Sequence, residues 1–126
     1  MSTDELAFKN TVVQLILAKE LDRALKALSE HFEVDVPRVK VGLPKRYKNK
    51  AGCYSSKDKT IYVMNREVLE DPFVVLHEFY HHVRTHGGKH MGTEKHADKF
   101  AREFIEAFQM FHRYSIRVSY SRPNEP

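Results

Sequence analysis

The chain has 126 residues, which fits one domain with a single hydrophobic core. Hydrophobic residues make up 41% and charged residues 30% of the sequence, as in a soluble domain with a charged surface, and the net charge of +4 permits an acidic partner or nucleic acid without requiring one. No window approaches the ~18 consecutive apolar residues of a membrane-spanning helix, and the N-terminus lacks a signal-peptide pattern. The single cysteine, Cys53, excludes an intramolecular disulfide and a cysteine-based zinc knuckle. These features predict a cytoplasmic protein with no membrane partner.

Residues 4–32 are expected to form a helix that backs the rest of the fold. Apolar residues recur there at intervals of three, four and seven, which is the period of one helix face. The members of this stripe are Leu6, Val13, Leu17, Leu21, Ala24, Leu28 and Phe32. Because the stripe drifts around the helix, we expect a bend near residues 18–20.

The next region, residues 38–64, is predicted to form a short, mostly antiparallel sheet of about three strands. Strands are expected at 38–42, 51–55 and 59–64, and the last is rich in β-branched and aromatic residues. A basic loop at residues 44–50 separates the first two strands. Its Lys and Arg side chains are either a contact for nucleic acid or an acidic substrate, or an ordinary solvated loop.

Residues 71–86 are predicted to form the central helix. Asp71 is a favourable N-cap, Pro72 suits the first helical position, and two glycines suit the end of the helix. On a helical wheel the apolar side chains gather on one side, whereas His77 and His81 lie on the other. The pattern therefore separates a core face from a histidine face.

The central helix carries the sequence His77-Glu78-Phe79-Tyr80-His81, which matches His-Glu-x-x-His. Histidines four residues apart lie one above the other on a helix, so both imidazoles reach one zinc ion. The glutamate between them can touch a water molecule on the metal without binding the metal itself. The motif therefore predicts a Zn²⁺ site with His77 and His81 as ligands and Glu78 as the catalytic base.

A second helix is predicted over residues 93–112, and residues 113–126 are expected to form a tail. Apolar residues line one side of this helix, and Lys, Arg and Glu line the other. In the tail, Ile116, Val118 and Tyr120 alternate with polar residues, which indicates a late strand.

A third protein ligand is needed to complete a catalytic zinc site. The metzincin pattern, with a third histidine six residues after the second, is excluded because a glycine stands there. His86 and His96 are set aside because they point away from the site. We prefer Glu94, with His90 as the alternative ligand, because Asp98 follows Glu94 by one turn and can accept the free N–H of a zinc-bound histidine. The competing interpretation makes Glu94 a residue that stabilises the helix dipole and Asp98 a surface charge.

The His-Glu-x-x-His motif at His77, followed by Glu94 and Asp98, resembles the gluzincin branch of the zinc metallopeptidases. The order of strand, central helix and glutamate-bearing helix over residues 60–108 is similar to the ImmA/IrrE-type peptidases and to the single-domain minigluzincins. The SprT-like proteases, which use a third histidine, are the second choice and would make His90 the ligand.

The resemblance implies a small α+β zincin-like domain with zinc-dependent peptidase activity. In such an enzyme zinc activates a water molecule, Glu78 takes its proton, and the substrate is a peptide or protein. The resemblance also implies that the substrate adds as an extended chain to the strand that contains Ile61, Tyr62 and Val63. The candidates for stabilising the oxyanion are Tyr80, His82, Arg84 and His90.

Minigluzincins can carry a segment that covers the cleft. Residues 113–120 are therefore expected either to pair with residues 60–64 and keep the enzyme latent, or to be an ordinary terminal segment. The alternative function is a zinc-stabilised binding or regulatory module with little or no turnover, which would contact nucleic acid through the basic loop. An intact Glu78 favours the enzyme, because a purely structural metal site needs no base.

Overall fold

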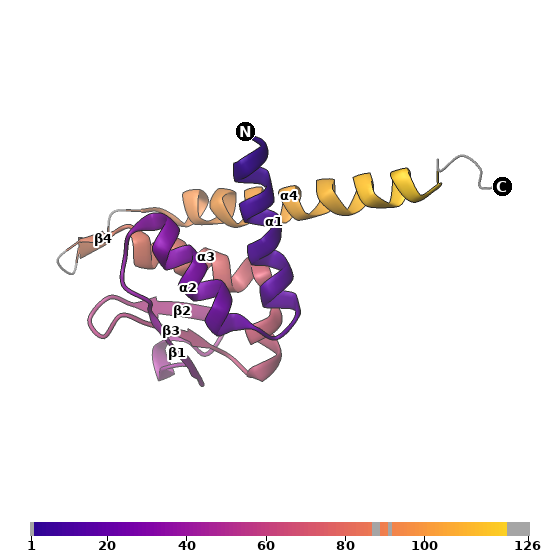
Figure 1. Ribbon diagram of the computed structural model, residues 1–126. Helices are drawn as coiled ribbons and strands as arrows, with labels where there is room; N and C mark the ends of the chain where they lie inside the picture. The colour runs from indigo at the N-terminus through magenta and orange to yellow at the C-terminus, as the bar shows by residue number, and fades with distance from the viewer. Residues whose placement is uncertain (1, 87–88, 91, 121–126) are drawn as a thin grey trace.

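The computed structural model describes the backbone of residues 2–86, 89–90 and 92–120, and the side chains of residues 2–85 and 92–113. In chain order, its elements are α1 (Thr3–Leu17), α2 (Leu21–Phe32), β1 (Arg38–Val41), η1 (Lys45–Tyr47), β2 (Gly52–Ser55), β3 (Thr60–Val63), η2 (Arg66–Glu70), α3 (Pro72–Val83), β4 (Thr85–His86), β5 (Lys89–His90) and α4 (Glu94–Tyr120). Figure 1 shows the helices stacked on one side of a three-stranded sheet. The predicted α+β class, with one small domain, is confirmed.

The helix predicted over residues 4–32 is two helices, because the chain turns at Lys19. Lys19 has a φ of +65°, and its N–H donates to the Ile16 carbonyl at 3.2 Å. The Glu20 N–H donates to the Leu15 carbonyl at 2.9 Å. These two bonds form the Schellman pattern that ends helices, usually with glycine in the left-handed position. The apolar stripe therefore changes direction at a helix end and not at a bend.

The three-stranded sheet is mixed, and β3 is its middle strand. β1 pairs with β3 in parallel, with Val39 opposite Ile61, and β2 pairs with β3 antiparallel, with Cys53 opposite Tyr62. The parallel pair arises because the chain passes from β1 to the far edge, as β2, before it returns to the centre. Since both edges of β3 are occupied, the expectation that residues 60–64 form a free edge for a substrate is wrong.

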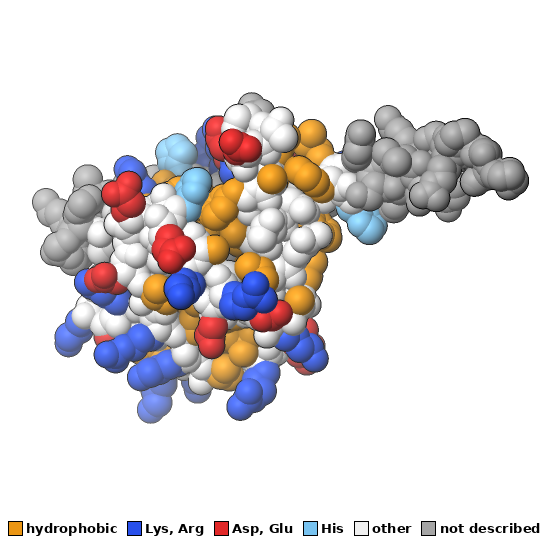
Figure 2. Space-filling model, in the orientation of Figure 1, with side chains coloured by type: hydrophobic (Ala, Val, Ile, Leu, Met, Phe, Trp, Pro, Cys, Tyr) orange, Lys and Arg blue, Asp and Glu red, His pale blue; other side chains and the backbone are white. Residues whose placement is uncertain are grey.

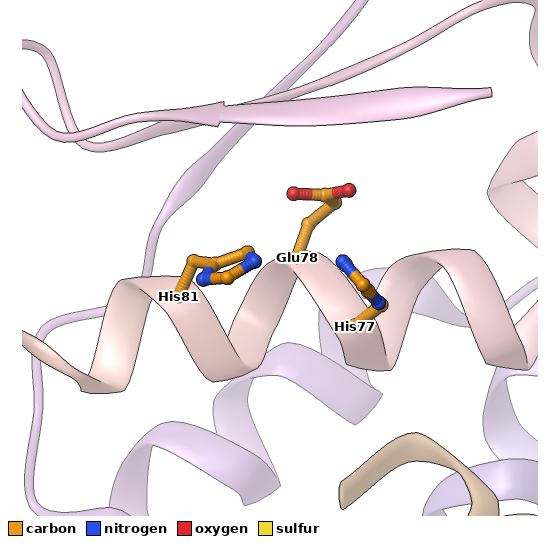
Figure 3. A group of neighbouring side chains, drawn as sticks. All are labelled: His77, Glu78 and His81. Atoms are coloured by element: carbon orange, nitrogen blue, oxygen red, sulfur yellow. The ribbon is translucent and has the colours of Figure 1, made fainter. Parts of the chain in front are cut away.

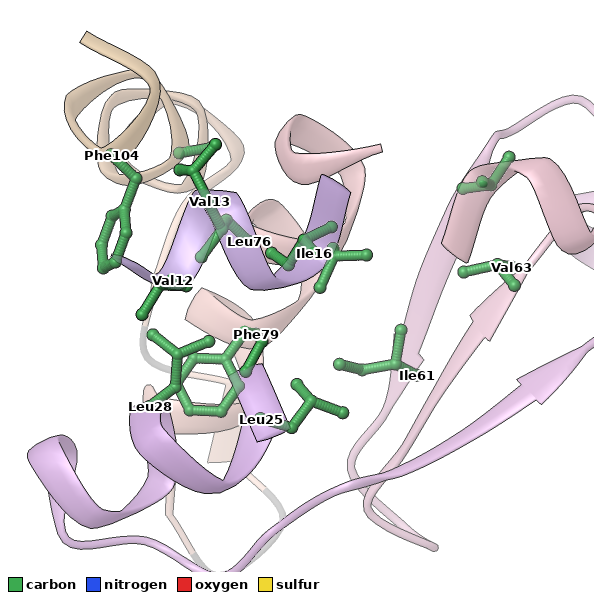
Figure 4. Close-up of a cluster of buried hydrophobic side chains, with 14 residues drawn as sticks. Val12, Val13, Ile16, Leu25, Leu28, Ile61, Val63, Leu76, Phe79 and Phe104 are labelled. Atoms are coloured by element: carbon green, nitrogen blue, oxygen red, sulfur yellow. The ribbon is translucent and has the colours of Figure 1, made fainter. Parts of the chain in front are cut away.

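One hydrophobic core joins the helices to the sheet (Figure 4). The largest fully buried side chains include Ile16 of α1, Leu28 of α2, Ile61 of β3, Phe79 of α3 and Phe104 of α4. Burying a side chain of this size stabilises the fold by about 1.5–3 kcal/mol. Because α3 packs on both α4 and β2, its position and rotation are fixed from two sides.

The central helix α3 begins where the sequence predicts but ends earlier. The Asp71 carboxylate accepts two backbone N–H bonds of the first turn, at 3.0 and 3.4 Å, and Pro72 starts the helix. The helix ends at Val83, and Thr85–His86 form β4, which pairs antiparallel with β5. The prediction of a helix over residues 71–86 is therefore wrong for its last turn. The β4–β5 hairpin reverses the chain within the short link to α4, which leaves no room for a longer helix.

The last helix, α4, runs past the predicted end at residue 112 and reaches Tyr120. The expected strand in the tail is wrong, because the backbone of residues 113–120 is helical. No glycine or proline stands between residues 93 and 122 to end the helix, and β-branched residues weaken a helix only slightly. The end of α4 extends away from the rest of the fold (Figure 1), and residues 121–126 lie outside the described part of the chain.

The surface charge is unevenly distributed. Figure 2 shows Lys and Arg side chains gathered around the end of the molecule that carries the sheet. Within the described part of the chain, no helix has both the length and the apolar character needed to cross a bilayer.

Replacing Lys19 with glycine should stabilise the fold, because glycine adopts a positive φ without steric cost. We expect the free energy of unfolding to rise by about 0.5–1 kcal/mol, measured by urea denaturation followed by circular dichroism. The matched control is Lys26→Gly in the exposed middle of α2, which should lose about 1 kcal/mol. A loss of stability in Lys19→Gly would contradict the left-handed turn.

Candidate metal centre

The central helix turns one face to the core and the opposite flank to a pocket. Val75, Leu76 and Phe79 on the core face are at most 1% exposed. His77 and His81 lie one turn apart on the other flank, as their four-residue spacing requires (Figure 3). Burial of the core face therefore fixes the direction of both imidazoles.

His77, Glu78 and His81 form a buried group whose ligand atoms lie within 4.8 Å of one another. The side chains of His77 and His81 are 11% and 5% exposed. Figure 3 shows the two rings on the same flank of α3, with the Glu78 carboxylate extending outwards between them. A group of this composition is able to hold a metal ion.

Glu94, the first residue of α4, faces both imidazoles. Its Oε1 is 2.6 Å from His81 Nε2, and its Oε2 is 3.3 Å from His77 Nε2. Partial burial raises the pKa of Glu94, but the charges and hydrogen bonds of the two histidines outweigh it and bring the pKa below its ordinary value. The Glu94 side chain is 69% exposed. The structure nevertheless brings the three ligands proposed from the sequence together.

Asp98, one turn after Glu94, holds His77 from the other side of its ring. The Asp98 Oδ1 is 2.9 Å from His77 Nδ1. Because a carboxylate only accepts hydrogen bonds, Nδ1 donates its proton to Asp98, and Nε2 is the nitrogen that faces Glu94. Contacts of this kind fix the tautomer and orientation of metal-binding histidines.

This set of donors fits a metal ion. The His77 Nε2 lone pair and a Glu94 oxygen repel each other unless a cation or a proton lies between them. Tetrahedral zinc, with bonds near 2.0–2.2 Å, separates two donors by about 3.3 Å, which matches the distance between these two atoms. The shorter contact between His81 and Glu94 would need to open by about 0.7 Å.

Glu78 extends towards β2, which packs closely on α3. A Cβ atom on Gly52 would stand 3.5 Å from Glu78 Cγ and 2.8 Å from Val74 Cγ1, so only glycine fits at this point of β2. Burial raises the pKa of the Glu78 carboxyl to about 7, against a lowering by His77, and the Glu94 carboxylate adds to the rise. A carboxyl group with a pKa near neutrality is able to take up and release a proton at physiological pH.

His82, a candidate for the oxyanion, is buried and has a structural role. Its Nδ1 is 2.7 Å from the Tyr54 hydroxyl, and its Nε2 is 2.7 Å from the Asp35 carbonyl. Nε2–H must donate to the carbonyl, so Nδ1 accepts from the hydroxyl. Burial lowers the pKa of His82, which favours the neutral ring that this pattern needs. His82 therefore ties α3 to β2 and to the segment before β1.

A pocket of about 140 Å³ lies beside the histidines. Its walls come from α3, from α4 and from the segment that leads into β2, and they comprise Tyr47, Lys50, Gly52, Cys53, Tyr54, Glu78, His81 and Glu94. Sequence analysis missed the contribution of residues 47–54. The sequence feature that could have indicated this wall of the pocket is the basic loop next to a glycine at the start of a strand.

The strand residues proposed to bind substrate do not line this pocket. Ile61 and Val63 are buried in the core. The Tyr62 hydroxyl donates to Asp58 at 2.8 Å, which turns it towards the β2–β3 turn. The side chain of His90, the alternative ligand, lies outside the described residues.

The other residues considered in the sequence also lie away from the pocket. The Tyr80 ring packs against Gly92 and Phe100, and Arg84 is exposed. His96 is exposed and its Nδ1 is 2.7 Å from the Thr93 hydroxyl, at the start of α4. None of these side chains lines the pocket beside the histidines.

Asp98→Ala should weaken Zn²⁺ binding about 10- to 100-fold, because His77 loses the group that fixes its tautomer. Competition with a chromogenic chelator measures the change. Glu106→Ala removes an exposed carboxylate from the same helix and should leave the affinity unchanged. Equal affinities for Asp98→Ala and wild type would contradict a role for Asp98 in holding the ligand.

The free energy of unfolding of the metal-free protein should depend on pH through the titration of Glu78. The pKa of Glu78 is about 7 in the folded protein, above its ordinary 4.5. Folding therefore favours the protonated carboxyl, whose stabilising effect is complete below the ordinary pKa and lost as the pH rises through 7. Relative to Glu78→Gln, the wild type should lose about 1–3 kcal/mol between pH 4.5 and pH 8. Urea unfolding in EDTA measures the difference, and a pH-independent difference would contradict the prediction.

Comparison with known proteins does not assign this centre to a family. No family model, curated protein or solved structure matches the chain. The assignment of the site therefore depends on the residues and geometry described above.

Proposed function

We propose that the protein is a zinc-dependent peptidase. The observation that carries this proposal is the convergence of His77, His81 and Glu94, with the buried Glu78 beside them. Two imidazoles and one carboxylate are a ligand set of catalytic zinc sites, which keep one position open for water or substrate. A structural zinc site closes that position with a fourth protein ligand.

Each residue of the site would have a distinct role in peptide hydrolysis. When bound, zinc would polarise the scissile carbonyl and increase the acidity of a water molecule. Glu78 accepts a proton from the attacking water as its oxygen bonds to the carbonyl carbon, and delivers the proton to the amine when the C–N bond breaks. Asp98 keeps the His77 Nε2 directed towards the metal position.

An extended peptide is supported as the substrate by the outer edge of β2, beside which no strand lies among the described residues. β2 is an edge strand of the three-stranded sheet, and Gly52, Cys53 and Tyr54 line the pocket beside the histidines. A peptide that adds to an edge strand gains backbone hydrogen bonds and is held straight. Pairing with β2 would therefore place the scissile bond beside Glu78. We thus propose β2, and not β3, as the strand to which the substrate adds.

The alternative remains a zinc-stabilised binding or regulatory module. The Lys and Arg side chains around the sheet favour an acidic partner such as nucleic acid (Figure 2). The burial of Glu78 favours the peptidase, because an ionisable carboxyl group buried beside metal ligands costs stability and a binding module has no use for it.

Metal analysis combined with Glu78→Gln tests the proposal. The wild-type protein should bind about one zinc ion per chain and cleave casein or a peptide mixture. Glu78→Gln should keep the zinc and lose at least about 100-fold in kcat/KM. A wild-type protein that binds no metal, or a Glu78→Gln variant as active as the wild type, would overturn the proposal.

The third ligand is tested by comparing Glu94→Ala with His90→Ala. Loss of a direct ligand should reduce zinc affinity by more than the about 10- to 100-fold expected for Asp98→Ala. We expect that loss in Glu94→Ala alone. The opposite result would assign the ligand to His90 and favour the SprT-like alternative.

A further inference from the structure

The proposed hydrolysis leaves one charged side chain of the pocket without a role. Glu78, His81 and Glu94 hold the metal or move a proton, whereas Lys50 does neither. Among the described residues that line the pocket, Lys50 is the one Lys or Arg. The part of the chain that the structure describes offers it no carboxylate partner within ion-pair distance.

Lys50 is held at the pocket wall by Tyr47. The Lys50 N–H donates to the Tyr47 carbonyl at 3.0 Å, which closes a turn between η1 and β2. The Lys50 Nζ also lies 5.9 Å from the centre of the Tyr47 ring, within the range of a cation–π contact. Lys50 thereby shares a pocket wall with the buried Glu78.

Lys50 lines the same pocket as Glu78, the proposed catalytic base. A Cβ atom on Gly52 would stand 3.5 Å from Glu78 Cγ, and Lys50 precedes Gly52 by two residues. Lys50 lies just before β2, and two residues of chain span at most about 7 Å. A peptide paired with the outer edge of β2 would therefore bring the residue one or two places from the scissile bond to Lys50.

We propose that Lys50, supported by Tyr47, binds a carboxylate of the substrate beside the scissile bond. The inference rests on the proposed peptidase function and names its substrate class: peptides with Asp or Glu within two residues of the cleaved bond, or with a free C-terminal carboxylate there. An unpaired ammonium attracts such a group, whereas it repels Lys or Arg at the same place.

Cleavage-site mapping tests this selectivity. The zinc-loaded full chain is incubated with a proteome-derived peptide mixture, and cleaved bonds are identified by mass spectrometry. Wild type should favour an acidic residue near the cleaved bond by about fivefold over its amide, the effect of one solvent-accessible ion pair. Lys50→Glu should lose this preference and favour Lys or Arg. Lys57→Glu, an equal charge change in the exposed β2–β3 turn, should behave as wild type.

Matched peptides then separate the two sources of the carboxylate. One cleaved peptide is remade with Gln in place of Glu, and with an amidated C-terminus. A drop in kcat/KM for the Gln peptide assigns the contact to a side chain, and a drop for the amidated peptide assigns it to the chain end. The proposal would be overturned if wild type and Lys50→Glu showed the same preference for acidic residues. It would also be overturned if Lys50→Glu lost the same factor in kcat/KM on every peptide.

A failure of the peptidase function gives a different result. In that case wild type cleaves nothing, and fluorescence anisotropy decides on Lys50 instead. Zinc-loaded wild type and Lys50→Glu are titrated into labelled Glu-containing and Gln-containing versions of one peptide. Tighter binding of the Glu peptide to wild type alone supports the carboxylate site, and equal affinities overturn it.

Discussion

The packing of α4 against α3 is the contact on which the rest of the site depends. Leu76 and Phe79 bury one face of α3, which leaves His77 and His81 on the flank that α4 approaches. The first two turns of α4 then supply both carboxylates. Glu94 faces the Nε2 atoms of His77 and His81, and Asp98 faces the Nδ1 atom of His77. A shift of one residue in α4 would turn these carboxylates about 100° away, so the helix–helix contact and the donor set are a single structural feature.

The other wall of the pocket is held by a polar connection. His82, one residue after a proposed ligand, joins α3 to Tyr54 of β2 and to the carbonyl of Asp35. The two hydrogen bonds of this buried imidazole are costly to break, because each partner would remain unpaired in the interior. The close approach at Gly52 completes this wall and helps to bury Glu78, and this burial accounts for the direction of its pKa shift.

The basic loop has two parts with different surroundings. Lys45, Arg46 and Lys50 are all exposed, but of these three only Lys50 lines the pocket, together with Tyr47. The chain turns between Tyr47 and Lys50, and this turn separates the two environments.

The sequence by itself determined the fold class, the capped central helix and the separation of its core face from its histidine face. These properties depend on local periodicity and capping, which neighbouring residues settle. Only the tertiary structure decided that β3 is the middle strand, that α3 stops at Val83 and that α4 continues to Tyr120. It also decided that Glu94 reaches both imidazoles and that the loop before β2 lines the pocket. Strand order and contacts between helices join residues far apart in the chain, so no local pattern of residue types specifies them.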